Sequence, residues 1–278
     1  MSRRAWPAAL LAALPLFGQT DAVEIVRRSV ERDQDSFAKA KDYTYIERVS
    51  RQRLDSAGRA KATEAKTFDV TMIEGEPYRR QIEKNGQPLP PEERRKSEEK
   101  FDKELRRRQS ESPSQRAKRE AEAEKERRES REFLKELPRA FEFRLEGEQR
   151  VDGHDVWVVR AEPRADFQPR VKYAGMLKKF RGTLWVDKSS YDWVRVEAEA
   201  IDTVSYGLLL ARVARGTHFE FSQKRINGRI WLPDRIHIRM DARLGLVKHV
   251  NEDVDVSFTN YRKFQAESRI VPATARTE

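Results

Sequence analysis

A helical spacing of hydrophobic residues occurs once, near the start of the chain. From Ala22 to Ala40 apolar side chains recur about every three or four positions, which gives one apolar stripe along a helix. Asp21 stands at the expected N-cap, and Glu24 follows it at the capping-box spacing. The pattern predicts an amphipathic helix. The members of the stripe are Val23, Val26, Val30 and Phe37.

After Asp42 the apolar period changes to two, the period of a β-strand. Ser56-Ala57-Gly58 and Asn85-Gly86 are turn sequences, and Asn-Gly favours a two-residue hairpin because both residues tolerate positive φ. This part of the chain predicts successive hairpins. Their strands run from Tyr43 to Leu54, from the turn at Gly58 through Ile73, from Tyr78 to Glu83 and from Gln87 to Leu89.

Between Pro90 and Glu136 the alternation disappears, and Glu, Lys and Arg dominate. The break at Ser110–Pro113 separates two expected helices, because proline interrupts a helix and serine caps the next one. The helices run from Glu92 to Gln109 and from Ser114 to Leu137, and their few apolar contacts are Phe101, Leu105, Phe133 and Leu137. This insertion is either a solvated helical hairpin, a partly disordered segment or a dedicated binding arm.

From Pro138 onward the strand pattern returns. Asp152-Gly153 and Asn227-Gly228 predict turns, Pro163 ends a strand, and Pro233 indicates an edge or a bulge. A loop from Arg164 to Lys178 precedes the later strands. The apolar strands of this part are centred on Phe141–Leu145, Val156–Val159, Phe180–Asp187, Trp193–Val204, Leu208–Arg215, Phe219–Phe221, Ile230–Ala242 and Val254–Phe258.

About ten strands joined mostly as a meander must bury one face, and only one amphipathic helix and the edge of the charged pair are available to cover it. The predicted fold class is α+β and mainly antiparallel: a curved sheet or unclosed β-barrel with an N-terminal helix and an inserted helical pair. We expect residues 23–90 and 138–265 to share this sheet. Residues 91–137 form the charged insertion, and residues 266–278 form a polar tail.

The N-terminus has the pattern of a secretory signal peptide, predicted over residues 1–22. Arg3 and Arg4 precede an apolar stretch from Ala5 to Phe17, which is shorter than the roughly 20 residues of a spanning helix. Cleavage is expected between Gly18 and Ala22; the alternative is an uncleaved anchor. We therefore expect a periplasmic protein.

The net charge of +10 favours anionic partners, and export makes an anionic membrane surface a better candidate than nucleic acid. No cysteine is present, and the four histidines lack zinc-motif spacing. No nucleophile elbow or phosphate-binding loop occurs. The sequence therefore predicts no catalytic residue, no metal and no cofactor. The histidines are His154, His218, His237 and His249.

The positive signal is the concentration of large apolar side chains on predicted strands. A wide sheet with few helices either closes as a barrel or leaves a concave apolar face, and such faces hold ligands. The alternative interpretation of each side chain is ordinary core packing. The predicted ligand-lining residues are Trp157, Leu184, Trp185, Leu208, Leu210, Phe219, Phe221, Ile236, Ile238 and Met240.

The segment Phe180-Arg-Gly-Thr-Leu-Trp-Val-Asp187 is followed by Trp193-Val-Arg-Val-Glu197, and later by Ile230-Trp-Leu-Pro-Asp234. Together with the export signal and the leading helix, these segments resemble the outer-membrane lipoprotein-sorting proteins and their periplasmic lipoprotein-carrier relatives. The resemblance covers the sheet regions on both sides of the insertion. It implies an unclosed barrel with helices as a lid that binds lipoprotein acyl chains or another hydrophobic ligand without catalysis.

Three functions are compatible with these patterns. The first is a carrier or sensor that binds a lipid or a lipoprotein acyl chain in the concave sheet. The second is a cell-envelope scaffold that binds a protein partner through the charged helices. The third is an exported hydrolase, which requires histidine, carboxylate or serine side chains to converge in one pocket.

Overall fold

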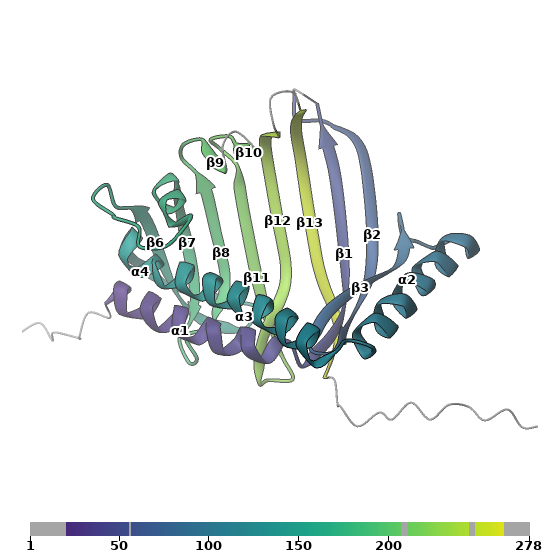
Figure 1. Cartoon of the computed structure of the whole chain (residues 1–278). Helices are drawn as coiled ribbons and strands as arrows, with labels where there is room; N and C mark the ends of the chain where they lie inside the picture. Colours follow the sequence, from purple (N-terminus) through teal and green to yellow (C-terminus); the bar gives the residue numbers. More distant parts are fainter. Residues whose placement is uncertain (1–20, 56, 207–210, 245–247, 264–278) are drawn as a thin grey trace, which may run out of the picture.

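Figure 1 shows the computed structural model of the chain, which describes residues 21–263 except 56, 207–210 and 245–247. The predicted signal peptide, the polar tail, Leu208 and Leu210 therefore lie outside the described residues. The described chain forms one antiparallel sheet of thirteen strands. In order along the chain they are β1 (Tyr43–Leu54), β2 (Ala60–Ile73), β3 (Glu76–Lys84), β4 (Gln87–Pro88), β5 (Phe141–Val151), β6 (His154–Pro163), β7 (Phe180–Asp187), β8 (Trp193–Ala200), β9 (Val204–Tyr206), β10 (Ala211–Val213), β11 (His218–Ile226), β12 (Ile230–Leu244) and β13 (Lys248–Lys263).

The strand order is β4-β3-β2-β1-β13-β12-β11-β8-β7-β6-β5, and the short β9–β10 pair joins β12. Chain neighbours are mostly sheet neighbours, as a meander requires. β8 pairs with β11 and β10 with β12 across short intervals, and the long-range exception is the pairing of β1 with β13, in which Val49 lies opposite Val256. This pairing places the first hairpins beside the last strand, so segments from both sides of the insertion build one sheet.

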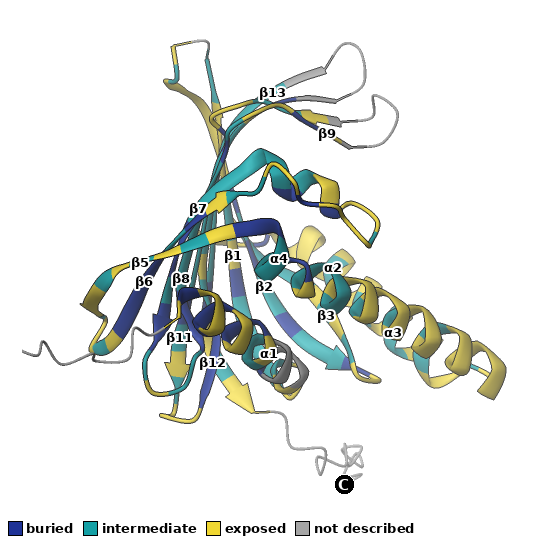
Figure 2. Ribbon diagram, turned by 90° about the vertical axis from the view of Figure 1, so that its left-hand side faces the viewer, coloured by how far each residue is buried: buried dark blue, intermediate teal, exposed yellow. Residues whose placement is uncertain are grey.

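The helices lie on one side of this sheet (Figure 2). The long helix α3 crosses the face between the two sheet edges, and α1 runs beneath it (Figure 1). The sheet curves around the helices without closing, which confirms the predicted unclosed α+β barrel. The helical elements are α1 (Ala22–Ala40), α2 (Pro91–Gln109), α3 (Pro113–Lys135), the short α4 (Leu137–Ala140) and the 3₁₀ helix η1 (Ala174–Lys179).

Helix α1 begins at its predicted N-cap, where Asp21 accepts a hydrogen bond of 2.9 Å from the backbone N–H of Val23. The predicted capping-box role of Glu24 is wrong, because its carboxylate binds Arg27 in the next turn. The buried stripe is also shifted from the prediction: Ile25 is buried, whereas Val23 is 42% exposed. Local sequence signals therefore gave the helix limits more accurately than its buried face.

The main core lies between α1 and the strands β5–β8. Ile25, Val26 and Val30 of α1 pack in one cluster with Trp157, Val186 and Trp193 of the sheet. The ends of α3 and α4 and the loop around η1 add further apolar contacts, among them Phe133, Leu134, Leu137, Phe167 and Leu177. One end of the inner face is thus filled by ordinary core packing.

Steric crowding by the neighbouring strand explains why position 182 of β7 is a glycine. A Cβ atom at this position would lie 2.4 Å from the carbonyl oxygen of Glu197 on the neighbouring strand β8. Gly182 lies opposite Ala161 on one side and Ala198 on the other, so three small residues meet in one cross-strand row. The glycine therefore permits a close approach of two strand backbones.

Candidate ligand-binding face

One row of cross-strand partners follows the inner face of the sheet through seven strands. Its apolar members are Val159, Leu184, Val196, Phe221, Ile236, Val256 and Val49, each opposite the next in the strand register. Val159 and Leu184 are buried in the main core, whereas Val196, Phe221, Ile236, Val256 and Val49 are only partly buried. Cover therefore decreases along the row, from the α1 side toward β1.

A second row lies one step further along the strands. Ala198, Phe219, Ile238 and Val254 are successive partners in it; Phe219 and Ile238 are partly buried, whereas Val254 is buried. Met240 continues the same face of β12 and is also partly buried. The two rows together make an apolar region of the inner face, over β8, β11, β12, β13 and β1, that helices cover incompletely.

Charged residues limit this apolar region on the β1–β3 side. Glu47 of β1 is buried, and the guanidinium of Arg79 from β3 binds its carboxylate, with Nε 3.0 Å from Oε2. The same guanidinium lies 4.2 Å from the ring centroid of Phe68. The first row itself ends in two lysines, because Val49 lies opposite Lys66, which lies opposite Lys84. Lys66 is itself paired with Glu64 at 3.1 Å, so the face is apolar along its length and charged at one end.

Helix α1 is fixed over the core end by polar contacts to the turn between β7 and β8. The indole Nε1 of Trp193 donates to the hydroxyl of Ser29 at 2.8 Å. Arg28 donates to the phenol oxygen of Tyr191 at 2.8 Å, and its guanidinium stacks on that ring. These contacts are specific in geometry, so they determine the position of α1 along the sheet.

Two carboxylates meet beneath α1. Asp192 is 2% exposed, and it accepts hydrogen bonds from Ser36 at 2.9 Å and from Arg32 at 3.3 Å. Burial raises the pKa of Asp33 to about 6, the negative charge of Asp192 adds to the rise, and a hydrogen bond with Gln223 opposes it. The underside of α1 therefore contains a carboxyl group that titrates near neutral pH.

Helix α3 crosses the inner face and contacts the sheet or the core along its first part and at its C-terminal end. Near its start Arg116 lies 3.9 Å from Glu74, and further along Arg127 lies 3.6 Å from Glu76, both at the β2–β3 turn. At its other end Phe133 and Leu134 pack against the main core. No residue of α3 is buried. The helix thus crosses the face without filling it.

The predicted ligand-lining residues fall into four groups. Phe219, Phe221, Ile236, Ile238 and Met240 lie on the partly covered inner face. Trp157 and Leu184 are buried in the core under α1. Trp185 packs with Val156, Val194 and Trp231 in a separate cluster on the other face, and Leu208 and Leu210 lie outside the described residues. The inner-face residues that the sequence analysis missed are Val49, Val196, Val254 and Val256, although strand alternation was a signal for each.

The nearest approach to a hydrolytic arrangement lies at Asp187. Its Oδ2 is 3.4 Å from Nδ1 of His154, and its Oδ1 accepts the hydroxyls of Ser189 and Ser190. Both serines donate to the carboxylate, so neither hydroxyl is directed to the imidazole that would have to deprotonate it. Among residues 21–263, where described, no group of three or more His, Cys, Asp or Glu side chains is arranged to hold a metal ion. In the same part of the chain, no helix is both long and apolar enough to cross a bilayer.

An unclosed antiparallel barrel with an apolar inner face and helices across it defines the structural class of this protein. Three solved structures match it over most of its length: a DUF1329 family protein from Desulfovibrio piger (13% identity, 88% of this chain and 94% of that chain, TM-score 0.33), a putative outer membrane lipoprotein-sorting protein domain from Vibrio parahaemolyticus (11%, 87% and 94%, 0.34) and a LolA superfamily protein from Nitrosomonas europaea (11%, 89% and 94%, 0.29). The matches include the lipoprotein-sorting class that the sequence resembles. At TM-scores below 0.5 they support no conclusion about ligand or activity.

No protein-family model matches the chain, and no curated protein matches it.

Proposed function

We propose that this chain is an exported, non-catalytic periplasmic carrier or sensor whose inner sheet face binds the hydrocarbon chain of a lipid or of a lipoprotein. The observation that supports it most is the decrease of cover along the first row. Val159 is buried completely, whereas its row partners Phe221, Ile236 and Val256 keep part of their surface accessible on the same face. Partly open apolar surface of this extent marks a place where a ligand completes the packing.

The dimensions and polarity of the row fit an acyl chain. From Val196 to Val49 the row crosses four inter-strand spacings, about 19 Å at the usual strand separation. An extended hydrocarbon chain of a membrane lipid has a comparable length. Lys84, the exposed lysine at the end of the row, suits the anionic head of such an amphiphile.

Binding of a fluorescent fatty acid tests this function directly. We expect saturable binding by the full mature chain, displacement by unlabelled fatty acid, and loss of most affinity in the variant Ile238→Gln, because an amide on this face raises the cost of burying the chain. Val23→Gln is the matched control, since Val23 is an apolar residue exposed on α1 away from the face. An unchanged affinity in Ile238→Gln, or no uptake by the wild type, contradicts the proposal.

A scaffold function through the charged helices is the second candidate. It is favoured by α3, which offers 23 residues with none buried to a partner. Under this function the wild-type chain takes up no fatty acid. Native mass spectrometry of the protein purified from an envelope fraction then shows no bound lipid. Stoichiometric lipid in the same spectrum favours the carrier instead.

A further inference from the structure

The outward face of α2 carries a stripe of cations. Lys96, Lys100, Lys103 and Arg107 recur at intervals of four, three and four residues, so they lie on one side of the helix. All four are exposed. Their interval of eleven residues corresponds to about 16 Å of helix. The stripe is therefore a linear array of positive charge on the surface.

The packing of α2 fixes the direction of this stripe. Phe101 of α2 meets the ring of Tyr78 on β3 with centroids 5.4 Å apart, and Ser97 donates to the carbonyl oxygen of Gln81 at 2.8 Å. Both contacts lie on the side of the helix away from the lysines. Glu92 precedes Lys96 by one turn on the same line of the helix, and Glu99 on the flank of the stripe is paired with Arg95 at 2.9 Å. Between Lys96 and Arg107 the stripe itself contains only cations.

The stripe continues into the elbow between α2 and α3. A shallow depression of about 510 Å³ lies there, and its lining contains three cations and no carboxylate: Lys103, Arg106, Arg107, Gln109 and Ser110. In the part of the chain that the structure describes, Lys96, Lys100, Lys103 and Arg106 form no ion pair. Their charge is available to an external anion.

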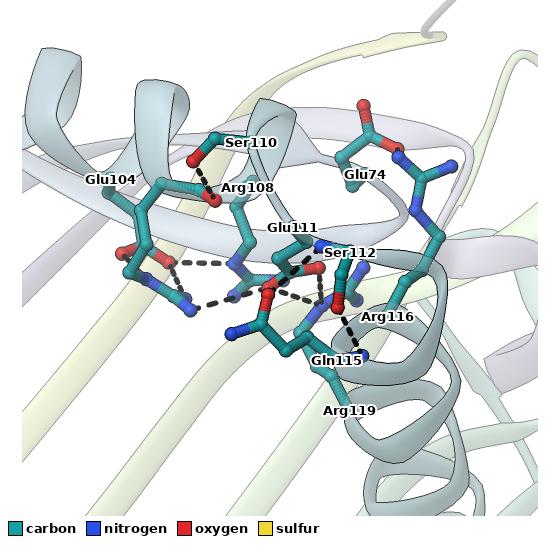
Figure 3. Close-up of polar contacts among 10 residues, drawn as sticks. Glu74, Glu104, Arg108, Ser110, Glu111, Ser112, Gln115, Arg116 and Arg119 are labelled. Carbon is teal, nitrogen blue, oxygen red and sulfur yellow. Dashed lines mark hydrogen bonds and ion pairs between the residues drawn. The ribbon is translucent and has the colours of Figure 1, made fainter.

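The interior of the elbow also has more cations than anions (Figure 3). Glu104 binds Arg107 and Arg108, and Glu111 binds Arg107 and Arg119, so three guanidinium groups share two carboxylates. Arg108 Nη1 and both terminal nitrogens of Arg119 are buried without a hydrogen-bond partner. The Ser112–Gln115 capping box holds the start of α3 in place. The elbow is therefore a fixed and electropositive end to the stripe.

We propose that the stripe and the elbow depression, residues 96, 100, 103, 106 and 107, form a docking surface for the phosphate headgroups of an anionic phospholipid bilayer. Phosphodiester groups in a bilayer are numerous and laterally mobile, which matches several free cations along one helix better than a single-anion site. The choice of a bilayer rests on the proposed function, since a carrier of acyl chains must meet the membrane that supplies or receives them. The docking surface lies on α2, outside the ligand-binding face.

Vesicle flotation with the full mature chain tests the docking surface. We expect binding to vesicles of phosphatidylcholine mixed with phosphatidylglycerol, little binding to phosphatidylcholine alone, and weaker binding at high salt. The triple variant Lys96→Gln, Lys100→Gln, Lys103→Gln should lower partitioning about a hundredfold, because each surface cation near an anionic bilayer contributes about a factor of five. These lysines make no ion pair within the described residues, so folding should be unaffected.

The matched control removes the same charge elsewhere: Lys61→Gln, Arg225→Gln, Arg229→Gln, all exposed and far from α2 in the sequence. Equal losses in both triple variants would mean that net charge alone attracts the chain, which overturns the proposal. Absence of wild-type binding to the anionic vesicles also overturns it. Fatty-acid uptake in solution is measured separately: vesicle binding without uptake contradicts only the carrier function, and uptake without vesicle binding contradicts only the docking surface.

Discussion

The hydroxyl of Ser36 donates a hydrogen bond of 2.9 Å to Oδ1 of Asp192, although the two residues are 156 positions apart. Arg32 approaches the other oxygen of the same carboxylate at 3.3 Å. A single buried side chain from the β7–β8 turn thus fixes two positions of α1. The helix that covers the core end of the candidate ligand-binding face is held by polar contacts as well as by apolar packing.

Removal of this carboxylate should loosen α1. We expect Asp192→Ala to lower the free energy of unfolding by about 2 to 3 kcal/mol, because the buried Ser36 hydroxyl and the Arg32 guanidinium lose their acceptor. Urea titration measures the change. Asp166→Ala is the control, since Asp166 is exposed and its ion pair is with Arg164. A loss no larger than that of the control would contradict the anchoring role.

The raised pKa of Asp33 predicts that the free energy of unfolding falls as pH rises. Burial and Asp192 raise its pKa in the folded chain from 3.8 to about 6, so the native state binds more protons than the unfolded state between these values. Its contribution is therefore greatest below the unfolded pKa and is lost as pH increases through about 6, a change of roughly 2 to 3 kcal/mol. The Asp33→Asn variant should reduce this slope in urea titrations between pH 4 and 7.

The polar groups around Asp33 beneath α1 provide a second test of its role in the pH dependence. Asp192, which also binds Arg32, faces it from the β7–β8 turn, and Gln223 faces it from β11. Gln223→Ala should steepen the pH dependence, because it removes the hydrogen bond that favours the ionised carboxylate. A pH profile of Asp33→Asn that matches the wild type would show that another group is responsible.

Substitutions at two valines of one cross-strand row distinguish core packing from the proposed ligand binding. Val159→Ala should cost about 2 kcal/mol of stability, because Val159 is fully buried. Val256→Ala should cost less than about 1 kcal/mol, because Val256 keeps part of its surface accessible. Fatty-acid affinity should change in the opposite order, with the larger loss in Val256→Ala. The same order in both measurements would assign both residues to the core.

Gly182 should not tolerate a methyl group. Gly182→Ala places a Cβ atom against the carbonyl oxygen of Glu197 and should lower stability by about 2 kcal/mol or more, as thermal unfolding would record. Gly175→Ala is a matched control, because its nearest new contact, Cγ of Pro169, lies at an ordinary 3.8 Å. Equal melting temperatures for both variants would contradict the close strand approach.

Elements with strong local signals were predicted closely. The helix from Ala22 to Ala40 has the limits that its cap and period indicated, and Asn227-Gly228 turns the chain between β11 and β12. The strand expected from Trp193 to Val204 is divided, because the backbone N–H of Ala200 binds the carbonyl of Thr217 and β8 ends there. Local alternation gives no sign of such a long-range bond.

The candidate site was predicted less completely, for two physical reasons. Leu184 and Trp185 are adjacent in one strand, so alternation itself places them on opposite faces, and Trp185 joins the outer cluster. The second reason is that local patterns do not show which residues of the inner face the helices bury: α1 buries Trp157 and leaves Ile238 partly exposed. That depends on tertiary contacts such as Trp193 with Ser29, which no local pattern specifies.

The pairing of β1 with β13 also constrains the order in which the sheet can form. Strand β1 is complete at Leu54. It pairs with β2 along one edge, but β13 (Lys248–Lys263), its partner along the other edge, is synthesised only near the end of the described chain. During synthesis β1 therefore waits with an unpaired edge for most of the chain, and long-range pairing of this kind slows folding. The parts of the sheet on either side of β13, β4-β3-β2-β1 and β12-β11-β8-β7-β6-β5, therefore remain separate until this last described strand joins them.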